Sequence, residues 1–165
     1  MVVELRKLSP DDGIDVYNML QEMPSENGFG NSIYGLSYDE YKQSLIKRDN
    51  ISKGIGLEDW MVPQNIYWLY IYGRPVGQGN LRHRLTDSLR IEGGHCGYGI
   101  APSQRGKGYG KLLLSLMKDE ARALGIDRML ITVYNDNPAS IRVAVSNGGV
   151  IENVTDKRHY IWIDL

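Results

Sequence analysis

One stretch of the chain, Ile100–Lys111, constrains the fold and the chemistry more than any other. Pro102 ends a strand within it, and a long amphipathic helix is expected to begin at about Tyr109. Backbone N–H groups at a helix start lack partners within the helix, and the helix dipole presents positive potential there. Three alternate glycines, from Gly106 to Gly110, remove Cβ atoms and let a ligand approach these amides closely. The stretch therefore predicts a site for an anionic phosphate or pyrophosphate group.

Two common phosphate-binding loops do not fit this stretch. The Walker A loop requires Gly-Lys followed by Ser or Thr, whereas Gly108 follows Lys107 and Leu112 follows Lys111. The dinucleotide fingerprint requires a glycine three residues after Gly108, where this chain has Lys111. A P-loop kinase and a Rossmann dehydrogenase are therefore not indicated.

Composition narrows the class of protein further. The chain has 165 residues, a formal net charge of −1, 42% hydrophobic and 24% charged residues, which is typical of one globular domain spanning residues 1–165. The near-zero charge argues against a nucleic-acid partner. With one cysteine and no metal-ligand spacing among the three histidines, no disulfide framework or metal site is expected. We find no signal peptide and no membrane-length apolar run, so the protein is expected to be cytoplasmic, without membrane contact.

Hydrophobic periodicity and turn residues predict alternating strands and helices. Helices interspersed among hairpin-forming strands favour a mixed three-layer α/β architecture over an all-parallel sheet. The expected strands cover residues 2–8, 66–71, 76–85, 91–100, 129–133, 150–154 and 159–163. The expected helices cover residues 10–23, 38–50, 109–124 and 138–147.

The junction and its surroundings resemble the GNAT superfamily of acyl-CoA-dependent N-acetyltransferases. Arg105-x-x-Gly108-x-Gly110 is similar to the R/Q-x-x-G-x-G/A signature of that superfamily. The similarity extends to Gly97–Pro102, to Asn137-x-x-Ser140 followed by Asn147-Gly148-Gly149, and to His159–Trp162. It is specific from about residue 66 onward and is greatest to a bacterial branch of predicted acetyltransferases of unassigned substrate.

The resemblance implies a fold, a cofactor and a reaction. The fold would be the GNAT α/β fold, a mixed, mostly antiparallel sheet of six to seven strands flanked by helices and splayed between strands four and five. The acyl donor would be acetyl-CoA, and the acceptor a primary amine of a small molecule or peptide. The residues expected to hold the donor are Tyr98, Ile100, Arg105, Gly106, Lys107, Gly108, Tyr109, Gly110, Lys111, Asn137 and Ser140.

An amine must lose its proton before it attacks a thioester, and an alkyl ammonium has a pKa near 10.4, so a base or a water relay is needed. The candidates are Glu92 and His95, both expected on the fourth strand. Because they lie three residues apart, an undistorted strand would place them on opposite faces. A bulge at Gly93-Gly94 would relieve this conflict. The alternative is that Glu92 is a solvated charge and His95 a structural residue.

The proton donor to the departing thiolate is also open. Many GNAT enzymes carry a Tyr seven residues after the Asn of this block, where the present chain has Ala144. Tyr134, Ser140 or water would have to replace that hydroxyl. Ala144 also favours the alternative function, a catalytically silent CoA-binding regulatory module. The acceptor amine and the oligomeric state, including a possible homodimer, remain open.

Several further residues are weaker candidates. The loops at residues 23–36 and 51–65, rich in Gly and Asn, are expected to cover the acceptor side. Arg82-His83-Arg84 would suit an acidic acceptor or the CoA 3′-phosphate, or else a solvated strand edge. An aromatic set would line an acceptor pocket or form a helix packing face: Tyr34, Tyr38, Tyr41 and Trp60.

Overall fold

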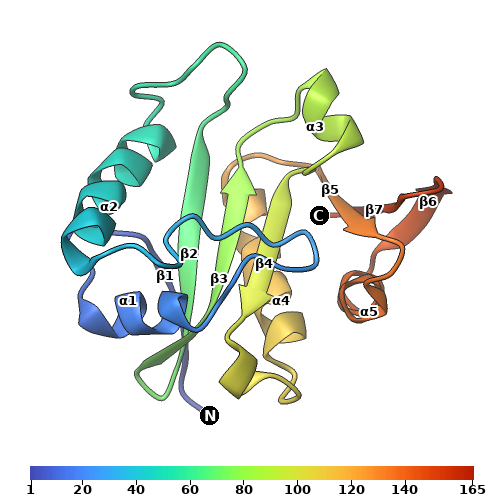
Figure 1. Ribbon diagram of the computed structural model, residues 1–165. Helices are drawn as coiled ribbons and strands as arrows, with labels where there is room; N and C mark the ends of the chain where they lie inside the picture. The colour runs from blue at the N-terminus through green and yellow to red at the C-terminus, as the bar shows by residue number, and fades with distance from the viewer.

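The computed structural model describes residues 1–165 as seven strands, five α-helices and one 3₁₀ turn (Figure 1). The strands are β1 (Val3–Lys7), β2 (Gln64–Ile71), β3 (Arg74–Arg82), β4 (Cys96–Ile100), β5 (Arg128–Tyr134), β6 (Val150–Val154) and β7 (Arg158–Asp164). The helices are α1 (Ile14–Gln21), α2 (Tyr38–Ser52), α3 (Asp87–Ile91), α4 (Tyr109–Ala123) and α5 (Pro138–Ser146), with the 3₁₀ turn at Pro102–Gln104. None of these helices combines the length and apolar character needed to cross a bilayer.

The strands form two sheets that separate between β4 and β5. One sheet has the order β1-β2-β3-β4 and the other β5-β7-β6, and every paired strand is antiparallel. The two sheets touch where the N–H of His95 donates to the Leu130 carbonyl at 2.9 Å, and they diverge beyond this point. The expected α/β fold of six to seven mostly antiparallel strands, with a split between strands four and five, is confirmed.

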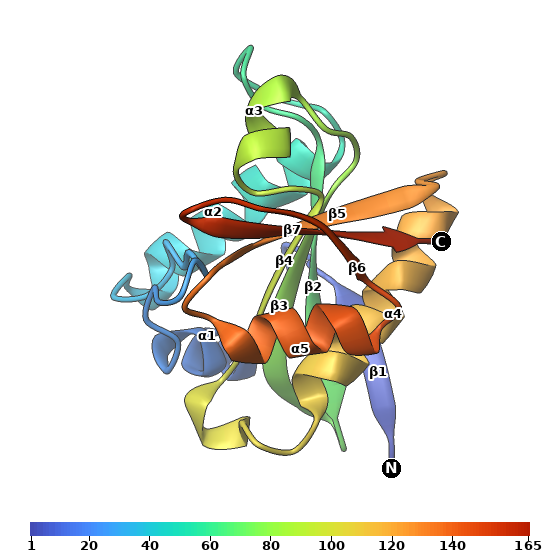
Figure 2. The ribbon, with the colours of Figure 1, turned by 90° about the vertical axis from the view of Figure 1, so that its right-hand side faces the viewer.

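Helices cover both faces of the larger sheet, and β2 shows why. Side chains alternate across a strand, so successive residues of β2 enter two different cores. Tyr67, Leu69 and Ile71 join the core beneath α4 and α5. The intervening Ile66, Trp68 and Tyr70 join the core beneath α1 and α2. Figures 1 and 2 show α4 on one side of this sheet and α1 and α2 on the other.

The first helix begins later than expected. Pro10 was predicted at its first position, but α1 begins at Ile14, after Gly13, which offers no side-chain cap. The expected start at residue 10 is wrong because the carboxylate of Asp12 has other partners. Its carboxylate accepts the Ser9 N–H at 2.9 Å and the Trp68 indole N–H at 2.7 Å, which ties the turn to the sheet.

The predicted strand at 91–100 is also wrong in its first half. Thr86 caps a short helix, α3, by accepting the Leu89 N–H at 3.2 Å. Gly93 and Gly94 then adopt positive φ angles of 105° and 59°, a conformation that favours glycine over other residues. Strand β4 therefore begins only at Cys96, so neither Glu92 nor His95 lies on it.

Candidate active site

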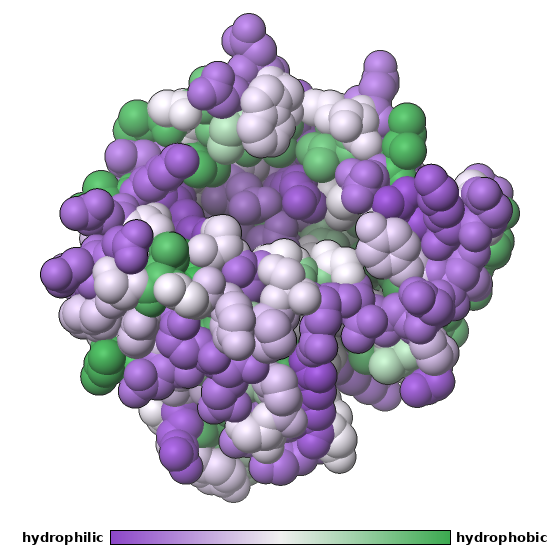
Figure 3. All heavy atoms as spheres, in the orientation of Figure 1, coloured by the Kyte–Doolittle hydropathy of each residue, from purple (hydrophilic) through white to green (hydrophobic).

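A cavity of about 800 Å³ opens along the split between the two sheets. It is lined at one end by the junction before α4, in its middle by β4, β5 and α5, and at its other end by β2, β3 and Arg48 of α2. Figure 3 shows a hollow in this face of the molecule with hydrophilic residues deep within it. The cavity therefore connects the predicted anion site to a separate polar compartment, here called the acceptor end.

The junction before α4 presents a run of free backbone donors. Gly106 and Gly108 adopt φ angles of 77° and 80°, and Gly108 precedes α4 without a side-chain cap. The first helical hydrogen bond is donated by Leu112, and none of the six consecutive N–H groups from Gly106 to Lys111 has an acceptor within the protein. Such a run of amides, at the positive end of a helix dipole, suits a diphosphate.

The cationic side chains of the junction play different parts. Arg105 donates from Nε to the Ile100 carbonyl at 3.1 Å and pairs with Glu26, so its guanidinium fastens the junction to the 26–30 loop. Lys107 donates to Gln104 at 3.1 Å and does not line the cavity, whereas Lys111 does. The backbone, rather than a set of lysines, is therefore the principal anion site.

Between the sheets, β4 faces the gap with free backbone groups. The ladder bonds that flank β4 join Arg82 N–H to the His95 carbonyl at 2.7 Å and Ala101 N–H to the Val76 carbonyl at 2.9 Å. Along an antiparallel pair, the backbone groups of successive residues point alternately toward the partner strand and away from it. The N–H and C=O groups of the odd-numbered residues of β4 therefore point toward β3. The N–H groups of Tyr98 and Ile100 consequently point toward the gap, where they can stabilise a developing oxyanion.

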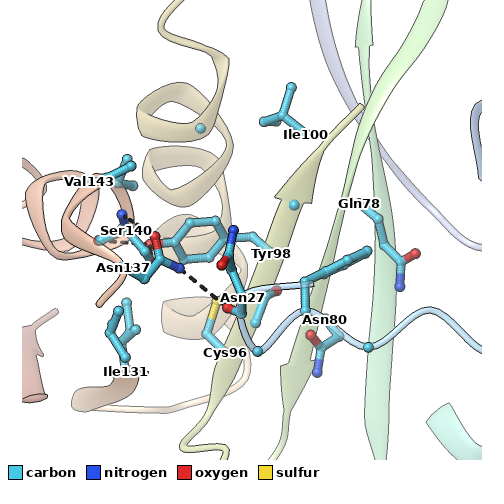
Figure 4. A pocket seen from close by; sticks show the side chains of 18 of the residues that line it. Asn27, Gln78, Asn80, Cys96, Tyr98, Ile100, Ile131, Asn137, Ser140 and Val143 are labelled. Atoms are coloured by element: carbon cyan, nitrogen blue, oxygen red, sulfur yellow. Dashed lines mark hydrogen bonds between the residues drawn. The ribbon is translucent and has the colours of Figure 1, made fainter. Parts of the chain in front are cut away.

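The far side of the gap is formed by the start of α5 (Figure 4). Tyr98 reaches across from β4, and its hydroxyl lies 2.9 Å from Ser140 Oγ. Burial raises the pKa of Tyr98, so the phenol stays protonated. Asn137 caps α5 by accepting the Ser140 N–H at 3.3 Å, and it donates to the Asn27 carbonyl at 3.3 Å.

The two predicted covering loops contribute unequally to the cavity. Residues 26–30 line the cavity. The ring of Phe29 packs so closely on Gly99 that a Cβ added to Gly99 would lie only 3.0 Å from the ring. Of the loop expected at residues 51–65, only Gln64 lines the cavity, and it lies on β2. Trp60 is 76% exposed. Of the two alternatives for the aromatic set, the structure matches the helix packing face, because Tyr38 and Tyr41 pack against Tyr17. None of the set lines the cavity: Tyr34, Tyr38, Tyr41 and Trp60.

Glu92 and Tyr134 belong to one chain of contacts at the edge of the cavity. Glu92 follows α3 with its side chain 67% exposed, and its carboxylate lies 3.1 Å from the Arg158 guanidinium. Arg158 in turn donates to the Tyr134 hydroxyl at 3.4 Å and lies over its ring. All three side chains line the cavity, so the structure brings two predicted catalytic residues to the same side.

His95 has a different environment from Glu92. It is 6% exposed, does not line the cavity, and its Nδ1 accepts the Leu130 N–H at 2.9 Å. Burial, with contributions from Arg90 and Arg82, lowers its pKa to about 4. The neutral imidazole thus continues the contact between β4 and β5 at the point where the sheets meet, which matches the structural alternative.

This role predicts acid sensitivity. The folded pKa of His95 lies below its ordinary 6.5, so its contribution to stability is complete above pH 6.5 and is lost as the pH falls toward 4. The free energy of unfolding should fall by about 2–3 kcal/mol from this group over that range. His95→Asn retains an acceptor for the Leu130 N–H but cannot titrate, so urea unfolding at pH 7 and 4.5 should show a smaller decline. Equal declines in the two proteins would refute this role.

The acceptor end contains polar residues that the sequence analysis largely missed. Gln78, Asn80 and Arg82 alternate along β3 with small or apolar residues, which places all three on the same face. Asn80 donates to Gln64 of β2 at 2.9 Å, and Gln78, although 6% exposed, has no side-chain partner within the protein. The alternation Gly77-Gln-Gly-Asn-Leu-Arg82 was the available signal, because a strand covered on both faces seldom carries three polar side chains.

Comparison with known proteins decides the family. A family model described as the acetyltransferase (GNAT) family matches residues 31–148. The chain belongs to the GNAT family. No curated protein matches the chain.

Solved GNAT structures share the fold at low sequence identity. An acetyltransferase of the GNAT family from Streptococcus pneumoniae has a TM-score of 0.66 at 18% identity, with 99% of each chain covered. RimL, a ribosomal L7/L12 alpha-N-protein acetyltransferase in complex with coenzyme A, has a TM-score of 0.74 at 17% identity, with 100% of this chain and 95% of that chain covered. The putative acetyltransferase yncA from Salmonella typhimurium, solved with its cofactor acetyl-CoA, has a TM-score of 0.64 at 18% identity, with 100% and 95% covered.

The chain departs from the common GNAT pattern at Ala144. This residue is fully buried in the core beneath α4 and α5 and does not line the cavity. Its carbonyl accepts the N–H groups of Asn147 at 3.1 Å and Gly149 at 3.0 Å, which ends α5. The residues that line the cavity with a hydroxyl group are Tyr98, Tyr109, Thr132, Tyr134 and Ser140.

Proposed function

We propose that this GNAT protein is an acetyl-CoA-dependent N-acetyltransferase that acts on a primary amine of a small molecule or peptide. One observation carries the proposal: the free amides from Gly106 to Lys111 open into a cavity that continues through the split between β4 and β5 to a polar acceptor end. The complexes of RimL with coenzyme A and of yncA with acetyl-CoA support the choice of donor.

The residues present fit the coenzyme. The amides of Gly106 to Lys111 would hold the diphosphate, with Gly106, Gly108 and Gly110 leaving room for it, whereas the Arg105 N–H already donates to the Pro102 carbonyl. Tyr98 and Ile100 on one side, and Asn137 and Ser140 on the other, would flank the pantetheine arm. Bound acetyl-CoA supplies an acetyl thioester, whose C–S bond breaks as the amide C–N bond forms.

The protein's own groups would manage the protons and the charge. Glu92, which is largely exposed, would accept the amine proton through water, and the N–H groups of Tyr98 and Ile100 would stabilise the oxyanion. Tyr134 would return a proton to the thiolate. Because Nδ1 of His95 already accepts a hydrogen bond and His95 lies outside the cavity, we leave it out of this chemistry.

A catalytically silent coenzyme-binding module is the second candidate, favoured by the burial of Ala144. Calorimetry with acetyl-CoA, followed by thiol release across an amine panel, separates the two. An enzyme binds the donor and releases thiol with at least one amine. Binding without turnover of any amine favours the module, and the absence of heat with millimolar acetyl-CoA contradicts both.

Loss of the Tyr134 hydroxyl should have a modest effect. A thiol with a pKa of about 8.5 is an easy leaving group, so Tyr134→Phe should lower kcat about 3- to 10-fold and leave the KM for acetyl-CoA unchanged. Steady-state thiol release measures both. A 3- to 10-fold lower kcat in Ser140→Ala, with Tyr134→Phe silent, would assign the proton to Ser140 instead.

A further inference from the structure

The acceptor end holds two arginines that have no carboxylate partner. Five cationic and two anionic side chains line the whole cavity. Each of the two carboxylates already has an arginine: Glu26 pairs with Arg105, and Glu92 with Arg158. Arg48 of α2 and Arg82 of β3 are half-buried, line the cavity and form no ion pair. The acceptor end is therefore positively charged.

Most donors of these two guanidinium groups are uncommitted. Arg48 donates to Ser32 Oγ at 2.6 Å, and Arg82 donates from one nitrogen to the carbonyls of Gly93 and Gly94 at 3.1 and 3.2 Å. A guanidinium has five N–H donors, so both retain free ones. Burial lowers the pKa of both groups, which reflects the cost of holding a charge away from water without a counter-ion.

The remaining polar groups at this end are neutral amides. Gln78 is nearly buried, and since every enclosed polar side-chain atom has a partner, its unpartnered amide must open into the cavity. Gln64 and Asn80 complete this wall. No free carboxylate is present to attract a polycation, which disfavours polyamines and aminoglycosides as acceptors.

We infer that the acceptor is a primary amine that also carries an oxyanion, a carboxylate or a phosphate, and that Arg48 and Arg82 bind this oxyanion. This inference rests on the proposed function and adds the substrate class. Arginine matches the geometry of both oxyanions through paired N–H donors. The amide of Gln78 supplies a further donor beside them, and the amine then points toward the gap between β4 and β5.

Matched amines test the inference. Thiol release by the full chain would be measured with β-alanine against propylamine, L-threonine against threoninol, phosphoethanolamine against ethanolamine, and with spermidine. The anionic member of at least one pair should have the higher kcat/KM by about 10- to 100-fold. The first two pairs report a carboxylate, and the third a phosphate. Equal or greater activity with spermidine or with the amines that lack an anionic group would overturn the inference while leaving the proposed function intact.

Substitution of the two arginines tests whether they bind the anionic group of the acceptor. Arg48→Gln should raise the KM for the amine with the anionic group about 10- to 100-fold. The KM for its counterpart without that group, and the affinity for acetyl-CoA, should not change. Lys47→Gln removes the same charge from the exposed neighbouring position and should have no effect. Because Arg82 also holds the turn before β4, Arg82→Gln is interpreted only alongside its melting temperature. Equal losses with both amines in Arg48→Gln would overturn the inference.

A binding measurement separates the inference from the proposed function. If no amine is turned over, the thermal shift of the CoA-saturated protein is measured with the same pairs. A stabilisation by the anionic members that Arg48→Gln abolishes would support the anion site although acetyl transfer had failed. No difference within any pair, in turnover or in thermal shift, would overturn the inference.

Discussion

Gly108→Val is expected to weaken acetyl-CoA binding by about 10²-fold or more, because it displaces several amides at once. Gly108 has a φ of 80°, which a β-branched residue rarely adopts, so the backbone before α4 must move. Each hydrogen bond from an amide to a charged oxygen is worth about 1.5–3 kcal/mol, and loss of two gives at least this change. Titration calorimetry with acetyl-CoA measures it.

Gly73→Val is the matched control. Gly73 has a φ of 74°, lies in the turn between β2 and β3, and, like Gly108, has no neighbouring atom within 4 Å of an added Cβ. Both variants should lose similar stability, whereas only Gly108→Val should lose affinity. Unchanged binding in Gly108→Val, or equal losses in the two variants, would contradict the assignment of the diphosphate to this junction.

Glu92→Gln should lower kcat by about 10²-fold and leave acetyl-CoA binding unchanged. General base catalysis by a positioned group contributes at least this much, and glutamine keeps the size of the side chain while removing its basicity. The ion pair with Arg158 is lost as well, but Glu92 is largely exposed, so the fold should tolerate the change. Thiol release with the best acceptor amine provides the measurement.

Glu152→Gln is the control for this substitution. Glu152 lies on β6 and pairs with Arg128 at 2.6 Å, away from the cavity, so it removes a comparable surface ion pair without touching the site. It should retain the activity of the unmodified protein. Full activity in Glu92→Gln would remove Glu92 from the mechanism and leave deprotonation to water.

The fold was predictable where local signals and burial agreed. The helices expected at 38–50 and 109–124 match α2 and α4 closely. A capping box at Ser37 fixes the start of α2, and Gly125, with a positive φ, follows the end of α4. The prediction of a helix start failed where a side chain typical of that position instead binds a residue that is distant in the sequence. The carboxylate of Asp12, expected in the first turn of a helix, instead binds the indole of Trp68, which is 56 residues away.

The site was predictable in the same uneven way. The Gly106–Lys111 junction is formed by residues adjacent in the sequence and depends on backbone conformation, so its glycines predict it. The acceptor end is assembled from α2, β2 and β3, and its charge depends on which arginines find carboxylates. Nothing near Arg48 in the sequence indicates that it stays unpaired. His95 was ambiguous because its role depends on Leu130, which only the meeting of the two sheets brings close.

The most direct test of the central claim is amide NMR of the ¹⁵N-labelled protein during titration with coenzyme A. Hydrogen bonds to a diphosphate should shift the N–H resonances of Gly106 to Lys111 strongly, and should leave that of Gly73 in place. Large shifts confined to other parts of the chain, with these amides unmoved at saturation, would show that the coenzyme binds elsewhere and would contradict the account.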